Sequence, residues 1–271
     1  TSVEDKLRGI SVLESIFLGC EMSPKFAMEV QQSGGIIFPH LEDRPFHPFR
    51  PYLYAPEELF AGFDRKDPCS YCQTPDAQIH LHWEATGRAS PRHVLDGILR
   101  RAHDQSVTDA LTEFLEAADR KVIAIMGGHS MLRTDLRYRE VAQISRTLTQ
   151  EGYLLVSGGG PGAMEATHLG AWFADRPGEE LEEALRLLAR APSYQDYEWL
   201  ACAFEVRERF PQTSDHCTSV GIPTWLYGHE PPTPFATHIA KYFANSLREE
   251  GLISIAYHGI IFSPGSAGTI Q

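Results

Sequence analysis

The sequence predicts an α/β protein, in which a Rossmann-like parallel sheet with helices on both faces follows a mixed helical N-terminal domain. Two observations support this fold class. After residue 120, short apolar runs alternate with amphipathic segments, and glycine-rich turns follow the apolar runs. Alternating strands and helices with apolar strands are typical of a parallel sheet covered by helices. We place an accessory domain at residues 1–120 and the sheet domain at 121–271, with a helical insertion at about 174–218.

The first strands and helices of the sheet domain have clear boundaries in the sequence. Residues 122–126 form a short, wholly apolar run typical of a buried strand. A helix is expected to begin near Thr134 or Asp135, both favourable N-cap residues, and to end before Gly152. A second strand is expected at 153–156 and a second helix at 163–173.

The rest of the sheet domain is predicted from the same spacing rules. Residues 179–190 and 194–209 have amphipathic helical spacing and would form the insertion. A strand is expected at 219–227. A helix should then begin with Pro234 near its first position, since Phe235, Ile239 and Phe243 recur every four residues. The last expected strand spans 258–263.

The first 120 residues carry weaker signals. Helical spacing is found at 3–20 and 91–119, and a proline-rich and aromatic run at 39–56 predicts an ordered loop. Cys69 and Cys72 form a C-x-x-C pair near His80 and His82, which are residue types that zinc prefers. Their spacing is not that of a common zinc finger, and the alternation at 78–82 also fits a strand. Zinc binding and reduced, structural cysteines both remain open.

Composition and charge exclude several classes of protein. The 271 residues include 24 Lys and Arg against 36 Asp and Glu, a net charge of −12. Nucleic-acid binding would lack its main electrostatic contribution. No apolar run approaches the roughly 20 residues of a membrane-spanning helix, and the first residues do not resemble a secretory signal. Five cysteines, an odd number, favour a reducing compartment. We therefore expect a cytoplasmic protein without nucleic-acid or membrane partners.

Three glycine-rich turns, at 127–130, 158–162 and 264–269, follow predicted strands. In a parallel sheet they share the carboxyl edge, where ligands bind. Glycine allows backbone N–H groups to approach a ligand, and the following helix directs its positive end at the same place. The turns therefore predict a phosphate or nucleotide site. The residues predicted to bind are Gly128, His129, Ser130, Gly158, Gly159, Gly160, Gly162, Met164, Glu165, Gly265, Ser266, Gly268 and Thr269. The spacing is not the G-x-G-x-x-G of NAD-binding proteins.

Three motifs resemble the Lonely Guy (LOG) family, whose members were formerly called lysine decarboxylases. They are GGGPGAMEA at 158–166, EPPTP at 230–234 and HGIIFSPGSAGT at 258–269. The larger bacterial members, which are nucleotide 5′-monophosphate nucleosidases, are the more similar ones. The resemblance covers about residues 121–271. It implies a Rossmann-like fold, a homodimer or higher homo-oligomer, and hydrolysis of a nucleoside 5′-monophosphate to base and ribose 5-phosphate. No metal or redox cofactor is required.

The resemblance also assigns site residues. The family pattern is Pro-Gly-Gly-x-Gly-Thr-x-x-Glu, and in this chain Ser266 replaces its second Gly. The final Glu of the pattern would follow Gln271, so we expect the chain to continue there. The catalytic arginine of the family aligns with Glu249, and Arg248, one residue away, is the candidate. A carboxylate beside the sugar can stabilise the oxocarbenium-like transition state.

Further residues are candidates for the same pocket. Glu165 would hydrogen-bond ribose hydroxyls, and Trp225, Tyr227 and His229 could stack on a base. A nucleotide-binding sensor or carrier that lacks hydrolysis is the alternative function, because Ser266 and the shifted Arg248 depart from the family pattern.

Overall fold

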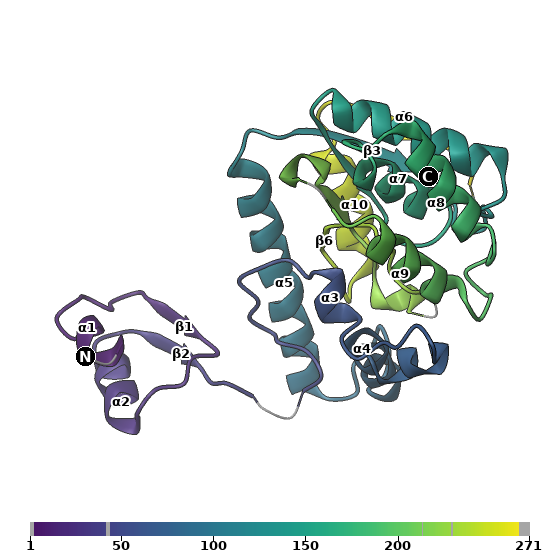
Figure 1. The fold of residues 1–271 in the computed structure, drawn as a ribbon. Helices are drawn as coiled ribbons and strands as arrows, with labels where there is room; N and C mark the ends of the chain where they lie inside the picture. Colours follow the sequence, from purple (N-terminus) through teal and green to yellow (C-terminus); the bar gives the residue numbers. More distant parts are fainter. Residues whose placement is uncertain (1–2, 42–43, 213, 229, 266–271) are drawn as a thin grey trace. The chain divides into compact units, whose positions relative to one another are not determined.

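The computed structural model describes residues 3–41, 44–212, 214–228 and 230–265. Its contacts divide the chain into two compact units, Thr1–Phe49 and Arg50–Gln271 (Figure 1). The division lies at 49/50, whereas the sequence suggested a boundary at 120. Residues 50–120 therefore belong to the same compact unit as the sheet.

The N-terminal unit is a small β-α-β arrangement. Strands β1 (Ile16–Leu18) and β2 (Ile36–Phe38) pair in parallel, and helix α2 (Pro24–Gln32) connects them. The Ser23 side chain accepts a hydrogen bond from the Phe26 N–H at 3.3 Å and caps this helix.

The helix expected at 3–20 is mostly wrong. Helix α1 covers only Val3–Leu7, and β1 begins at Ile16. Gly9 has a φ of +102° and Glu14 a φ of 61°, so the chain leaves the helical region twice between these elements. The apolar residues of this segment belong to a short helix and to a strand.

The larger unit contains a five-stranded sheet in which every pairing is parallel. The strand order is β6-β5-β4-β3-β7. This confirms the α/β class with a parallel sheet flanked by helices. The strands are β3 (Lys121–Met126), β4 (Tyr153–Ser157), β5 (Ser219–Gly221), β6 (His238–Ile239) and β7 (Ile260–Phe262).

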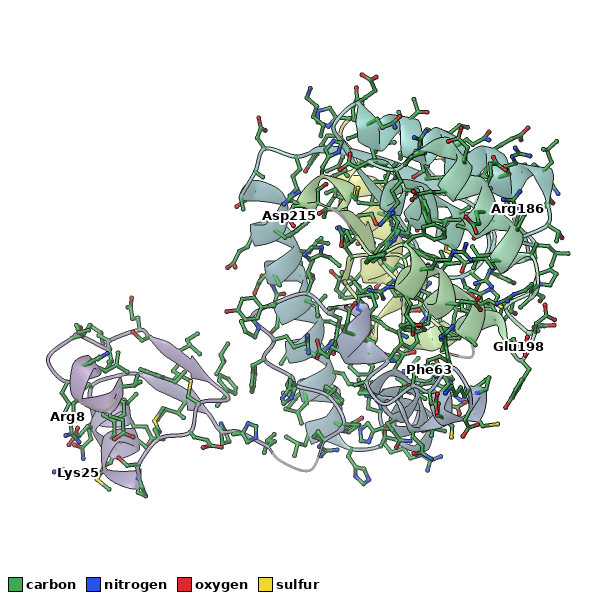
Figure 2. All side chains as sticks on the ribbon, in the orientation of Figure 1. Arg8, Lys25, Phe63, Arg186, Glu198 and Asp215 are labelled. Atoms are coloured by element: carbon green, nitrogen blue, oxygen red, sulfur yellow. The ribbon has the colours of Figure 1, made fainter. Side chains whose placement is uncertain are left out.

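Helices flank the sheet much as predicted. Helix α6 (Leu136–Gln150) is capped by Asp135, whose carboxylate accepts from the Arg137 N–H at 2.9 Å. Helix α7 (Ala163–Trp172) packs against α6 and against β3, β4 and β5. The insertion forms helices α8 (Gly178–Leu188) and α9 (Trp199–Arg209), as predicted. Charged side chains such as Arg186 and Glu198 lie on the outside of this region (Figure 2).

Two elements near the end of the sheet differ from prediction. The strand expected at 219–227 is the short β5 followed by the 3-10 helix η3 (Trp225–Tyr227). No helix begins at Pro234: this segment forms β6, and helix α10 (Asn245–Ile255) begins later. The backbone at 239–240 is already paired, since the Ile239 N–H donates to Tyr54 O and the Ala240 N–H to Gly221 O, both at 2.8 Å. Tertiary pairing therefore overrides the apolar spacing.

Residues 50–120 form α3 (Pro56–Leu59), the 3-10 helix η1 (Pro68–Gln73), α4 (Pro75–Ala85) and α5 (Val94–Glu116). Helix α5 was predicted, whereas the alternation at 78–82, which also fitted a strand, does not form one. This segment lies inside α4, whose first turn is capped by the Thr74 side chain, which accepts from the Ala77 N–H at 3.4 Å.

Buried polar contacts join this segment to the sheet. The Lys241 Nζ lies 2.5 Å from Asp76 Oδ1, and both side chains are fully buried. Burial lowers the pKa of Lys241, although the Asp76 carboxylate opposes this shift. The carboxylate of Asp104, on α5, accepts from the N–H groups of Phe243 and Ala244, both at 2.9 Å. Helix α5 thus fixes the start of α10.

The possible zinc ligands do not come together. His80 Nδ1 lies 3.1 Å from the carbonyl oxygen of Trp225, and His82 Nε2 lies 2.8 Å from Asp96 Oδ1. Cys69 and Cys72 are exposed on η1. Within the described ranges, no cluster of three or more His, Cys, Asp or Glu side chains is arranged to hold a metal ion. A search of the same residues finds no helix with the length and apolarity needed to cross a bilayer.

Candidate functional site

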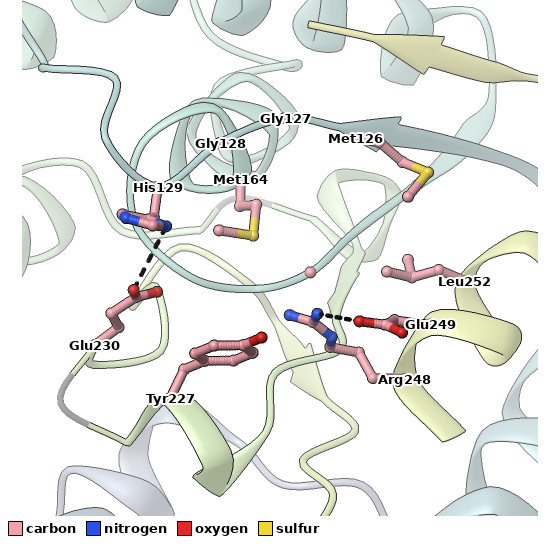
Figure 3. A pocket seen from close by; sticks show the side chains of 11 residues that line it. Met126, Gly127, Gly128, His129, Met164, Tyr227, Glu230, Arg248, Glu249 and Leu252 are labelled. Atoms are coloured by element: carbon pink, nitrogen blue, oxygen red, sulfur yellow. Dashed lines mark hydrogen bonds and ion pairs between the residues drawn. The ribbon is translucent and has the colours of Figure 1, made fainter. Parts of the chain in front are cut away.

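The candidate site lies where the strand order reverses. From β3 the chain adds strands in one direction as far as β6, and then returns through α10 to place β7 on the other side of β3. Ligands bind at such a reversal, outside the carboxyl ends of the strands. A cavity of about 190 Å³ is found there. Its lining consists of Met126, Gly127, Gly128, His129, Gly158, Met164, Tyr227, Glu230, Arg248, Glu249 and Leu252 (Figure 3).

Three glycines of the turns are required by close packing. A Cβ at Gly127 would lie 2.4 Å from Ala163 Cβ, and one at Gly162 would lie 2.5 Å from Gly128 O. Gly162 also has a φ of +70° at the N-cap of α7. A Cβ at Gly159, where φ is also +70°, would lie 2.9 Å from the Ile222 nitrogen. These positions hold the turns after β3, β4 and β5 against one another.

The other two glycines of the second turn face side chains of the site. A Cβ at Gly158 would lie 2.7 Å from Met164 Sδ and 4.0 Å from an Arg248 guanidinium nitrogen. At Gly160 it would lie 3.0 Å from Met164 Cε and 3.7 Å from Glu230 Oε2. Gly158 lines the cavity. The lack of a side chain therefore keeps space open beside Arg248 and Glu230.

One wall of the cavity is formed by α10 and carries the positive charge. The Arg248 side chain is 19% exposed, lies 3.2 Å from Glu249 Oε1 and stacks over the Tyr227 ring at 5.2 Å. The Glu249 side chain is 49% exposed and also accepts from Asn245 Nδ2 at 2.6 Å. A guanidinium in this position can bind a phosphate or carboxylate.

The opposite wall carries a carboxylate and an imidazole. Glu230 has a side chain that is only 9% exposed, and its Oε1 lies 3.5 Å from His129 Nδ1. Figure 3 shows this pair on one side of the cavity and Arg248 with Glu249 on the other. The His129 ring makes an edge contact with Tyr194, in the connection between α8 and α9, at 5.8 Å. The helical insertion thus contacts the candidate site.

Glu165 is placed in a closed cluster and does not line the cavity. Arg133 donates two hydrogen bonds to its carboxylate, at 2.9 and 2.5 Å, and the Tyr138 hydroxyl donates a third at 2.8 Å. Arg133 also donates to the carbonyl oxygens of Ala191 and Trp199. Burial alone would lower the pKa of Arg133, but the adjacent Glu165 outweighs it and raises this pKa. The cluster joins α6, α7 and the insertion.

The remaining predicted residues have different placements. Ser130 is exposed and is not part of the lining, and Gly265 is exposed after β7. Trp225 is fully buried in the core, whereas Tyr227 lines the cavity. Ser266, Gly268, Thr269 and His229 lie outside the described residues.

The structure brings together Gly128, His129, Gly158, Met164 and Arg248 of the predicted set. Glu230 had no predicted role, although it begins one of the three motifs, at 230–234. A carboxylate directly before a proline-rich turn, after a predicted strand, was the available signal. Its importance follows from the fold, because only the fold places it opposite Arg248.

No protein-family model matches this chain, and the search of curated proteins gives no match either.

Proposed function

We propose that this protein is a nucleoside 5′-monophosphate phosphoribohydrolase, which hydrolyses the N-glycosidic bond to release free base and ribose 5-phosphate. The observation that carries this proposal is the cavity at the strand-order reversal, where glycine turns meet the Arg248 guanidinium and the Glu230 carboxylate. This combination provides an anion-binding wall and an acidic wall in one pocket.

The anion-binding wall suits the 5′-phosphate. Arg248 supplies a permanent positive charge at the cavity. Helix α7 begins after Gly162, which offers no capping side chain, and Met164 of its first turn lines the cavity. The dipole of a helix N-terminus favours an anion. Phosphate binding would then anchor the ribose and orient the reacting bond.

The acidic wall suits the cleavage step. Positive charge develops on the ribose ring as the C–N bond of a glycoside breaks. A carboxylate fixed in a partly desolvated site stabilises this charge more effectively than water does. The Tyr227 ring, which is 38% exposed, offers a surface on which a base can stack.

The motif resemblance to the LOG family supports the same reaction and adds further proposals. They are a Rossmann-like doubly wound sheet, a homodimer or higher homo-oligomer, and a cytoplasmic location. The observed strand order, in which the sheet extends from β3 in both directions, is consistent with such a fold.

The test is release of free base from AMP, GMP, CMP and UMP by the full chain, followed by chromatography. We expect release from at least one nucleotide, and much slower release from the matching nucleoside, since the nucleoside lacks the phosphate that Arg248 would bind. Absence of release from every nucleotide overturns the proposal. If calorimetry then shows nucleotide binding, the sensor or carrier function is supported instead.

A further inference from the structure

Three carboxylates are candidates for a role in the reaction, and they differ in burial and in whether they line the cavity. Glu165 accepts three hydrogen bonds from Arg133 and Tyr138 in a fully buried cluster. Glu249 is about half exposed on α10 and contacts Arg248 and Asn245. Glu230 alone combines a nearly buried side chain with a place in the cavity lining, on the wall opposite Arg248.

We propose that Glu230 is the catalytic base of the hydrolysis, a role that rests on the function proposed above. If Arg248 binds the 5′-phosphate on its own wall, the opposite wall faces the sugar. Glu230 is the carboxylate of that wall, and no side chain of Gly160 stands in front of it: a Cβ there would lie 3.7 Å from Glu230 Oε2. Water and the anomeric carbon can therefore reach the carboxylate.

Hydrogen bonds hold the backbone at Glu230 and after it, which is what a catalytic group requires. The Glu230 N–H donates to the Tyr227 carbonyl oxygen at 2.8 Å. Two prolines follow, and the Thr233 N–H then donates to the Gly159 carbonyl oxygen at 2.8 Å. The backbone after Glu230 is thus tied to the glycine turn after β4. A group held in this way loses little entropy on reaching the transition state.

The step balances without a cofactor. The oxygen of one water molecule forms a bond to C1′ of the ribose while the C1′–N bond breaks. The electron pair of the C1′–N bond leaves with the base nitrogen. Glu230 accepts a proton from the attacking water, and this proton is finally transferred to the departing base. The imidazole of His129 lies beside the carboxylate, with its Nδ1 3.5 Å from Glu230 Oε1. The products are ribose 5-phosphate and the neutral base.

The experiment compares Glu230→Gln and Glu230→Ala with a matched control, Glu151→Gln. Glu151 is an exposed residue at the end of α6, before β4 begins, and so lies at the opposite edge of the sheet. We expect Glu230→Gln to lower kcat about 100-fold or more, the effect typical of a removed general base. The KM should change little, because the phosphate wall remains. Glu151→Gln should match the wild type.

Formate separates a chemical role of Glu230 from a structural one. A small carboxylate can occupy the space left in Glu230→Ala and accept the proton, so added formate should restore part of kcat in this variant and leave Glu230→Gln unaffected. The role of Glu230 as the base is overturned if Glu230→Gln has the kcat of the wild type, or if formate does not restore activity to Glu230→Ala. Either result leaves the hydrolase function intact. Absence of base release by the wild type overturns both.

Discussion

Two charged clusters lie near the carboxyl edge of the same sheet, and each contains an arginine and a glutamate. In the closed cluster, Arg133 and Glu165 have side chains that are 1% and 0% exposed and form a bidentate pair. In the open cluster, Arg248 and Glu230 lie on opposite walls of a cavity. The closed pair is in direct contact, whereas a cavity that can hold a ligand separates Arg248 from Glu230.

Residue type and motif position therefore do not decide between stability and chemistry. Glu165 stands in the most conspicuous glycine motif of the chain, yet the protein itself occupies its hydrogen-bonding capacity. Glu230 stands in a less conspicuous loop and lines the cavity. Changes in the closed cluster should alter the free energy of unfolding, and changes in the open one should alter turnover.

The largest effect is expected for Glu165→Gln. It leaves the buried Arg133 guanidinium without a compensating charge, which should lower the free energy of unfolding by about 3–5 kcal/mol. Urea unfolding followed by circular dichroism measures this. The control is Glu182→Gln, which removes a partly exposed ion pair with Arg139 and should cost under about 1 kcal/mol. Equal stability of the two variants would show that the closed cluster is not structural.

Arg248→Ala should lower the activity strongly and the free energy of unfolding only slightly. Loss of the positive wall should lower kcat/KM for the best nucleotide about 100-fold, equivalent to about 2.7 kcal/mol of transition-state binding. The free energy of unfolding should fall by less than about 1 kcal/mol, since Arg248 contacts a half-exposed partner. Arg186→Ala, an exposed arginine on α8, is the control for charge. Unchanged kcat/KM in Arg248→Ala would contradict the binding of the 5′-phosphate by Arg248.

The glycines give a third way to separate packing from binding. Gly127→Ala places a Cβ against Ala163, and we expect it to lower the free energy of unfolding by about 2 kcal/mol through overpacking. Gly158→Ala meets the flexible end of Met164 and should cost less than half as much, while weakening nucleotide binding. Thermal unfolding and calorimetry check the two quantities. Similar stability losses would contradict the assignment of these glycines to two roles.

A buried histidine under the same edge gives the smallest expected effect at neutral pH, because its contribution changes only as the pH falls. His168 lies between the hydroxyls of Ser157 and Ser219, at 2.8 and 2.9 Å, and burial lowers its pKa to about 3. It stays neutral in the fold, whereas the unfolded chain takes up the proton near pH 6.5. Its contribution to stability is complete above pH 6.5 and is lost as the pH falls towards 3.

The loss should reach about 1.4 kcal/mol per pH unit between pH 6 and 4. His168→Gln should unfold with a shallower dependence on pH over this range, measured by urea titration at several pH values. Parallel curves for the two proteins would show that His168 titrates normally in the fold.

Much of the sheet could be predicted from local sequence. The apolar runs at β3 and β4, the caps at Asp135 and Gly152, and the amphipathic spacing of α8 and α9 are all properties of neighbouring residues. The segment 234–244 could not be predicted in this way. Its four-residue spacing suits a helix, but its backbone pairs with β5 and with Tyr54, which are distant in sequence.

The candidate site likewise has features that depend on neighbouring residues and features that depend on long-range contacts. The glycine turns after the strands of a parallel sheet could be predicted from the residues alone, because strand polarity and glycine conformation are local properties. Long-range packing sets which charged groups face the cavity. Arg133 closes over Glu165 from another helix, while the return of the chain through α10 brings Arg248 opposite Glu230. Burial and pairing depend on residues far apart in the chain, so they set the roles of identical side chains.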